Sequence, residues 1–156
     1  MRDFIPSGLW SNFSRTNYDY ISRLELWENA AYIISSNPLT GVGANAFSSL
    51  LENRTGYWRA HTHNLPLQVM VSYGIPSAIL ILTPVTMLIM ATIKKVFFEC
   101  KNFYKRDIYD RAWAISLINL TIAHLVDMQY FDGRISISGW VLLSGASNII
   151  KKTIKT

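Results

Sequence analysis

The side chains with the clearest chemical capacity gather in the segment "RAHTHN", residues 59–64, which runs directly into a long uncharged stretch. The imidazoles of histidines such as His61 and His63 can accept or donate a proton near neutral pH. The guanidinium of Arg59 keeps its charge at any relevant pH and can hold an anion through two parallel hydrogen bonds. Proton transfer beside a bound anion is therefore the chemistry that this segment allows.

A metal site at the two histidines is one alternative. His61 and His63 are two residues apart, so in an extended segment their side chains point in opposite directions. A metal needs further ligands, and no cysteine or acidic cluster lies nearby in the sequence to supply them. We therefore expect no metal here. The plainer alternative is that Asn64 caps the helix that follows and that His63 is a polar residue at a membrane interface.

Charged groups at two other places could contribute to the same site. Arg23 stands in the first turn of a predicted helix, where a cation is unfavourable unless an anion is close by. A solvated Arg23 is the alternative. His124 and Asp127 lie three residues apart near the end of a second apolar run, and ionisable groups at a membrane rim are often functional. They either join the same cavity or close a hairpin, and the spacing leaves both open.

The elements that must position these groups are membrane helices. Residues 65–93 contain no charged side chain, and about 20 apolar residues suffice to cross a bilayer. Two shorter uncharged runs, 112–126 and 135–150, flank the polar turn "DMQYFDGR" and together predict a membrane hairpin. The sequence thus predicts an all-α, polytopic membrane protein with about three spans, near residues 67–93, 112–128 and 135–150.

The positive charges are distributed unequally along the chain. Every lysine lies between the first and second apolar runs or after the third, so the positive-inside rule places these regions and the C-terminus in the cytoplasm. Residues 1–64 and the turn at 127–134 then face outward and carry arginines but no lysine. The net charge of +5 follows from this topology, so we expect no nucleic-acid partner.

Residues 1–64 form the predicted outward region, ahead of a membrane region at 65–156. Ser22 and Glu25 have the spacing of a capping box before an apolar stripe, so we expect an amphipathic helix over about 22–36, lying on the bilayer or against other spans. The segment "GVGANA" has the spacing of a dinucleotide fingerprint without its strand–helix context. We interpret it as a tight reversal before a short helix at 44–51. An outward region of this size needs a preceding span, so we expect a C-terminal part of a longer protein.

Three segments together resemble bacterial O-antigen ligases and the related O-antigen polymerases. "SRLELWENAAYIISSNPLTGVGANAF" is similar to the family's run of Arg, Trp, Pro-Leu and Gly-x-Gly ahead of its catalytic histidine. "HNLPLQVMVSYGIPS" matches the pattern of His-Asn, nine residues and Gly, here His63, Asn64 and Gly74, whereas Ser77 departs from the family's usual Gly, Thr or Tyr. "HLVDMQYFDGRISISGWVLLSG" resembles the final hairpin. The resemblance covers nearly all of this chain but only about the last third of a typical member.

This resemblance implies a metal-independent glycosyltransferase of the inner membrane, without a cofactor, in lipopolysaccharide biosynthesis. It would pass a glycan from undecaprenyl pyrophosphate, on the periplasmic face, to a hydroxyl of lipid A–core or of another repeat unit. His63 matches the catalytic residue, and Arg23 is the best match to the family's functional arginine in this loop. Arg59 is a further candidate for the pyrophosphate, with Asn64, His124 and Asp127 as possible support. A second important family arginine lies upstream, so we expect the isolated chain to lack a complete site.

Two other functions remain as alternatives. Some relatives have been labelled bicarbonate transporters, but transporters usually place their polar groups near the middle of the membrane, and here these groups cluster outside the first span. An inactive, truncated remnant is the other alternative. Neither the choice between ligase and polymerase nor the identity of the sugars follows from the sequence.

Overall fold

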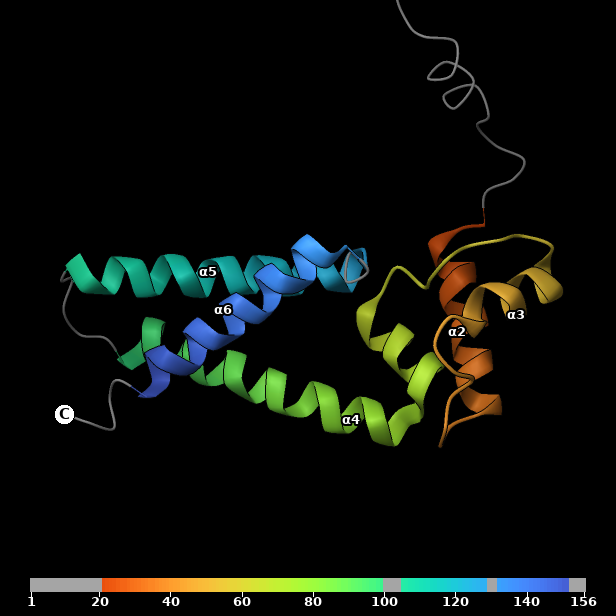
Figure 1. The fold of residues 1–156 in the computed structure, drawn as a ribbon, viewed down its shortest axis with the longest axis horizontal. Coiled ribbons are helices and arrows are strands. Elements are labelled where there is room, and N and C mark those ends of the chain that lie inside the picture. The colour runs from red at the N-terminus through yellow and green to blue at the C-terminus, as the bar shows by residue number, and fades with distance from the viewer. Residues whose placement is uncertain (1–20, 100–104, 129–131, 152–156) are drawn as a thin grey trace, which may run out of the picture.

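The computed structural model describes residues 21–99, 105–128 and 132–151, and every regular element in these ranges is a helix. The all-α prediction is confirmed. The elements follow one another as shown in Figure 1: α2 (Arg23–Ser36), α3 (Ala46–Thr55), α4 (Leu65–Ile93), the π-helical turn η2 (Lys94–Glu99), α5 (Lys105–Val126) and α6 (Gly133–Lys151).

Helices α2 and α3 lie together at one end of the molecule, α5 and α6 lie toward the other end, and α4 extends between the two groups (Figure 1). The first half of α4 packs against α2, and its second half packs against α5 and α6. A buried core joins α2, α3 and the beginning of α4, and includes Leu26, Phe47, Leu51 and Val71. The amphipathic helix α2 therefore uses its apolar face against a long helix, one of the two arrangements that the sequence predicts.

The predicted helix boundaries agree with the structure to different degrees. Helix α2 begins at Arg23 after the N-cap Ser22, whose Oγ accepts a hydrogen bond from the Glu25 N–H at 3.2 Å. Helix α3 spans Ala46–Thr55 and so lies later than the predicted 44–51. Asn45 precedes it in the left-handed conformation, which keeps residues 44 and 45 outside the helix.

One helical stretch among the described residues, Leu65–Phe98, is long and apolar enough to cross a membrane. Its most apolar window is only 11% buried, so most of this surface is free to contact lipid. Helices α5 and α6 cover the other two predicted spans, but α5 begins well before residue 112 and ends at Val126. Asp127 therefore lies in the turn after α5. The crossing of the membrane by α5 and α6 stays a prediction.

A sharp bend at Gly74 divides α4 (Figure 1). Gly74 has φ 81° and ψ 169°, and Pro76 lacks the N–H that would bond to the Ser72 carbonyl. The Ile75 N–H donates to the Pro38 carbonyl at 2.8 Å and so leaves the Val71 carbonyl. The predicted bend near Gly74 and Pro76 is thus present, and it leaves two helical carbonyls available to other partners.

The loop between α2 and α3 fills this bend. The N–H groups of Val42 and Gly43 donate to the freed carbonyls of Val71 and Ser72 at 2.8 and 3.0 Å. A Cβ atom on Gly41 would lie 2.6 Å from the Gly74 nitrogen, and one on Gly74 would overlap the Leu39 carbonyl. The "GVG" segment is therefore a turn that docks main chain against main chain, consistent with the predicted tight reversal.

Candidate functional site

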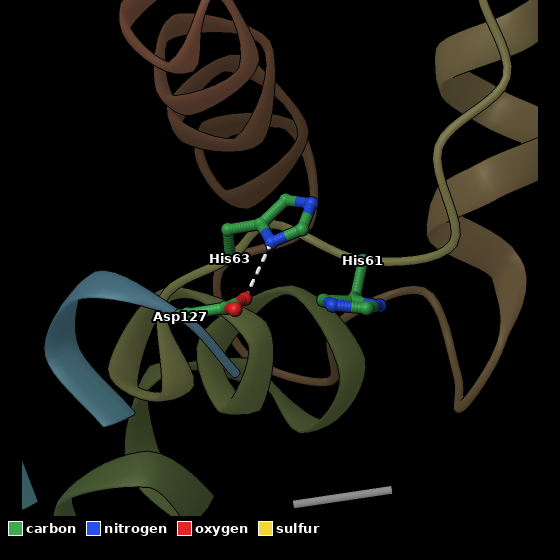
Figure 2. Close-up of side chains that lie close together, drawn as sticks. All are labelled: His61, His63 and Asp127. Carbon is green, nitrogen blue, oxygen red and sulfur yellow. Dashed lines mark hydrogen bonds and ion pairs between the residues drawn. The ribbon is translucent and has the colours of Figure 1, made fainter. Parts of the chain in front are cut away.

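His63 and Asp127 meet at one end of the long helices, although 64 residues separate them in the chain. His63 lies just before α4, and Asp127 lies just after α5 (Figure 2). The His63 Nδ1 and Asp127 Oδ1 atoms are 2.7 Å apart, and the side chains are 31% and 45% exposed. The two groups thus form a hydrogen-bonded pair that solvent and a ligand can reach.

The direction of this hydrogen bond follows from the charge of Asp127. The hydrogen bond from His63 lowers the pKa of Asp127 from its ordinary value of 3.8, and the charges of His63, His61 and Arg23 lower this pKa further against the effect of burial. An ionised carboxylate can only accept, so the His63 Nδ1 carries the proton. The Nε2 atom of the neutral ring then has a free lone pair and can act as a base.

His61 lies beside this pair, and the prediction that it points away from His63 is wrong. The ring centroids of the two histidines are 4.5 Å apart with the planes tilted by 47° (Figure 2). The reason is that His63 has φ 53°, in the left-handed region, which breaks the alternation of an extended strand. Burial lowers the pKa of His61 from 6.5, and His63 lowers it further against the opposing effect of Asp127. The neutral ring is therefore favoured at neutral pH.

His61, His63 and Asp127 each offer a metal-ligand atom, and these atoms lie within 4.8 Å of one another. Two imidazoles and a carboxylate are ligand types that zinc accepts. Asp127 lies 64 residues along the chain from His63, so the sequence close to the histidines does not indicate it as a ligand. The 2.7 Å separation of His63 Nδ1 and Asp127 Oδ1 is that of a hydrogen bond, whose proton a metal ion would have to displace. The geometry is that of a hydrogen-bonded histidine–carboxylate pair with a second histidine beside it.

Arg23 belongs to the same region. It is the first residue of α2 and is exposed, and its positive charge contributes to the lowered pKa of Asp127. An exposed cation at a helix N-terminus adds to the partial positive charge of the free N–H groups there. The N-terminal end of α2 is therefore electropositive, and it is close enough for the charge of Arg23 to act on Asp127.

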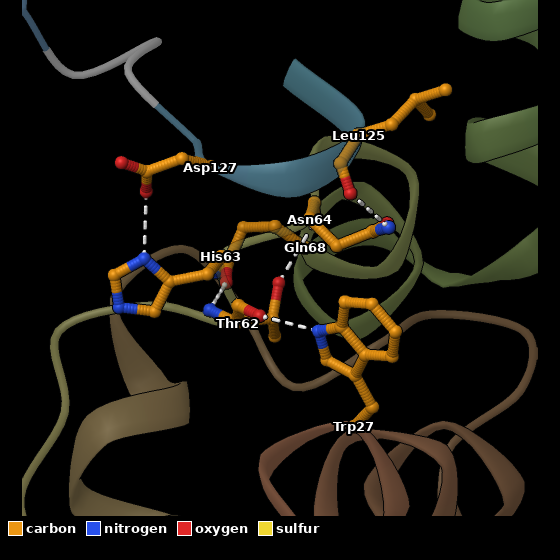
Figure 3. A network of polar contacts seen from close by, with 7 residues as sticks. All are labelled: Trp27, Thr62, His63, Asn64, Gln68, Leu125 and Asp127. Carbon is orange, nitrogen blue, oxygen red and sulfur yellow. Dashed lines mark hydrogen bonds and ion pairs between the residues drawn. The ribbon is translucent and has the colours of Figure 1, made fainter. Parts of the chain in front are cut away.

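Asn64 connects the site to two helices. Its Oδ1 accepts the Leu67 N–H at 3.0 Å, which confirms the predicted helix cap. Its Nδ2 also donates to the Leu125 carbonyl at 2.9 Å, near the end of α5 (Figure 3). One side chain thus begins α4 and ties it to the end of α5, next to both members of the His63–Asp127 pair.

The two remaining candidates, His124 and Arg59, each bond to a carbonyl close to them in the chain. The His124 Nδ1 lies 2.8 Å from the Leu120 carbonyl, one turn back along α5, so this ring bonds to its own helix. The Arg59 Nη1 donates to the neighbouring Trp58 carbonyl at 3.2 Å. These contacts are local and do not bring either side chain to the His63–Asp127 pair.

A buried polar network behind His63 was not predicted. The Thr62 N–H donates to Gln68 Oε1 at 3.0 Å, and the Thr62 carbonyl accepts Trp27 Nε1–H at 3.0 Å (Figure 3). Thr62 is fully buried, and Gln68 is 6% exposed. Gln68 is the single side-chain amide within residues 65–93, and such a lone polar group in an apolar run was the available signal.

Fold and site together define a class: a helical protein with one helix long and apolar enough to cross a membrane and a hydrogen-bonded histidine–aspartate pair at the N-terminal end of that helix. Comparison with protein families then gives a specific match. Residues 9–82, just under half of the chain, match the family described as O-Antigen ligase, and this match supports membership of that family. The matched segment includes Arg23, His63 and Gly74 but not Asp127.

The match supports a ligase- or polymerase-like function in polysaccharide biosynthesis, membrane association, and lipid-linked glycan and sugar substrates in general. No curated protein and no solved structure matches the chain.

Proposed function

We propose that this chain contributes the catalytic base of a glycan transferase, which moves a glycan from undecaprenyl pyrophosphate to a sugar hydroxyl on the periplasmic face of the inner membrane. The observation that carries the proposal is the 2.7 Å hydrogen bond between His63 Nδ1 and Asp127 Oδ1. In the neutral imidazole, a carboxylate that accepts from Nδ1–H fixes the tautomer whose Nε2 is unprotonated, as a general base requires.

In the proposed reaction, His63 Nε2 takes the proton of the acceptor hydroxyl while the hydroxyl oxygen bonds to the anomeric carbon of the donor glycan. The bond between this carbon and the pyrophosphate oxygen breaks, and the electron pair leaves with undecaprenyl pyrophosphate. Positive charge on the imidazole grows during the transfer, and the Asp127 carboxylate stabilises it. The His63 imidazolium then gives its proton to water or to the leaving pyrophosphate, and the neutral base is restored.

Arg23 is the proposed partner of the pyrophosphate. Negative charge grows on the leaving group as the glycosidic bond breaks, and a guanidinium can bind two phosphate oxygens at once. The position of Arg23 at the N-terminal end of α2, with its charge felt by Asp127, supports this role. Arg59 stays a second candidate that requires its side chain to leave the Trp58 carbonyl.

The placement of the site relative to the apolar helix supports a lipid-linked donor. His63 and Asn64 directly precede α4, and the stretch that is long enough to cross a membrane begins at Leu65. A donor with a polyprenyl tail carries its pyrophosphate just outside the hydrocarbon, at the height of such a helix end. The distribution of lysines supports the outward orientation of this end. A transporter would more commonly hold its polar groups within the span.

The direct test is His63→Ala in the full-length protein, assayed in membrane vesicles with a labelled lipid-linked glycan. General bases contribute about 10²–10⁴-fold, so we expect transfer to fall by that factor at a matched protein level. His124→Ala is the matched control, because it removes the same ring from a place where it bonds to its own helix. Full transfer by the His63→Ala protein would refute the proposal.

Parallel reactions with two different acceptors distinguish ligase activity from polymerase activity. Transfer to lipid A–core identifies a ligase, and transfer to a second lipid-linked repeat unit identifies a polymerase. Both reactions require the same base, so the loss in the His63→Ala protein is expected in whichever reaction the wild-type protein carries out.

A further inference from the structure

His63 adopts a conformation that its local sequence does not favour. It has φ 53°, and residues with a Cβ enter the left-handed region only where their surroundings determine it. This conformation turns the ring toward both Asp127 and His61. The groups that hold the backbone on either side of His63 therefore control the geometry of the pair.

On one side of His63, the peptide groups of Thr62 are bonded in both directions. Gln68 Oε1 accepts the Thr62 N–H, and Trp27 Nε1–H donates to the Thr62 carbonyl, each at 3.0 Å (Figure 3). The orientation of the Gln68 amide is unambiguous, because its oxygen must face this N–H. Its Nε2 then donates to Ser72 Oγ at 3.3 Å, so Gln68 is fixed from its other end as well.

The Thr62 hydroxyl forms a hydrogen bond across His63, the residue in the left-handed conformation. Thr62 Oγ1 donates to the Asn64 carbonyl at 2.8 Å, which links the residues before and after His63. Thr62 is fully buried, so water does not compete for this bond. Asn64 is itself held by Leu67 and Leu125. The backbone on both sides of His63 is thus anchored to α2, α4 and α5.

We propose that Thr62, Gln68 and Trp27 are positioning residues, which hold His63 in the left-handed conformation that directs its Nδ1 toward Asp127. The role rests on the proposed function of His63 as the general base. Trp27 also lies one helical turn after Arg23 on α2, so its bond to Thr62 fixes the base and the pyrophosphate-binding helix relative to each other.

Two pairs of variants test this proposal in the full-length protein. Thr62→Val keeps the buried shape and removes the hydroxyl, whereas Thr62→Ser keeps the hydroxyl. Gln68→Met keeps the length and removes the acceptor, whereas Ser72→Ala leaves that acceptor in place. We expect kcat to fall about tenfold in Thr62→Val and in Gln68→Met, the rate equivalent of about one hydrogen bond, with KM for the lipid-linked donor nearly unchanged. The Thr62→Ser protein should keep kcat near the wild-type value, and Ser72→Ala, which removes only the second contact of Gln68, should lose less than Gln68→Met.

The ¹⁵N NMR signal of the His63 ring gives a readout that does not depend on activity. Wild-type and Thr62→Ser proteins should show a protonated Nδ1 and an unprotonated Nε2, and Thr62→Val should lose this tautomer preference. If the Thr62→Val and Gln68→Met proteins keep both the tautomer signal and kcat while His63→Ala is inactive, the positioning role is refuted and the proposed function stands. If His63→Ala is active, the proposed function fails, and the NMR comparison alone decides the positioning role.

Discussion

Replacing Asp127 by asparagine tests whether the carboxylate sets the tautomer of His63. The amide preserves the size of the side chain but not its charge, and its NH₂ group can donate to His63 Nδ1. In that arrangement Nδ1 becomes an acceptor, the ring proton moves to Nε2, and the lone pair needed to take the acceptor proton is lost. The Asp127→Ala protein loses the carboxylate as well, but alanine cannot impose the wrong tautomer.

The size of the effect follows from the exposure of the pair. A hydrogen bond to a charged group contributes about 1.5–3 kcal/mol, and the lower end applies here because the two side chains are 31% and 45% exposed. About 1.5 kcal/mol corresponds to roughly a tenfold loss of rate. The wrong tautomer adds to this loss, up to the limit of about 10²–10⁴-fold for removal of the base. We therefore expect about a 10- to 100-fold fall for Asp127→Asn and a smaller fall for Asp127→Ala.

Initial rates of transfer in membrane vesicles, at protein levels matched by immunoblotting, measure this difference. The His63→Ala protein defines the rate without a base, and His63→Ala combined with Asp127→Asn should be no slower than His63→Ala alone, since both changes act on one group. Wild-type rates in the Asp127→Asn protein, or a clearly additive loss in the double variant, would refute the reasoning about the tautomer.

Three other predictions concern the arginine, the glycine contact and the neighbouring histidine. Arg23→Lys keeps the charge but cannot bind two phosphate oxygens in parallel, so transfer should fall about tenfold, and an unchanged rate would leave Arg23 as a solvated surface residue. Gly41→Ala should lower the free energy of unfolding in detergent by at least about 2 kcal/mol more than Gly43→Ala does. Both residues have positive φ, but only a Cβ on Gly41 would meet the backbone at Gly74, so equal losses would contradict this packing. The pKa of His61 is lowered from 6.5, so protonation of His61 favours the unfolded state, and the folded state loses stability as the pH falls below 6.5 toward the lowered pKa; the melting temperature should drop between pH 7.5 and 5.5, and less so in His61→Gln. Asp127, whose pKa is lowered from 3.8, affects stability only at more acidic pH, and an equal drop in the His61→Gln protein would assign the effect to other groups.

Local features of this protein follow from its sequence, because short-range rules determine them. Asn64 and Ser22 cap their helices through contacts three residues away, and the uncharged run at residues 65–93 became the helix α4 with the same bounds. The bend at Gly74 could also be expected, since glycine and proline stand two residues apart in a helix.

The arrangement of the candidate site depends on long-range contacts that the spacing of residues does not encode. The partner of His63 is Asp127, and the two long helices α4 and α5 separate these residues in the chain. The sequence indicated His124 and Asp127 only together, as a pair near the end of the second apolar run. The orientation of His61 was predicted from the alternation of an extended strand, and the left-handed backbone at His63 overrides this rule. The support from Gln68 and Trp27 requires α2 to pack beside α4, which periodicity alone does not specify.

The contact between the "GVG" loop and the bend of α4 has a consequence for mutational tolerance. Its three hydrogen bonds join Val42 to Val71, Gly43 to Ser72 and Ile75 to Pro38, and every donor and acceptor is a main-chain atom. The exposed side chains around it, Leu39, Thr40 and Tyr73, contribute none of these bonds, so random substitutions there should be recovered freely in a functional selection. Gly41 and Gly74, where a Cβ atom would meet backbone atoms, should be nearly invariant in the same library. The loop that follows α2, the helix of Arg23, therefore stays attached to α4, the helix that follows His63, when most of its side chains are changed. Substitution of Gly41 or Gly74 should break this attachment.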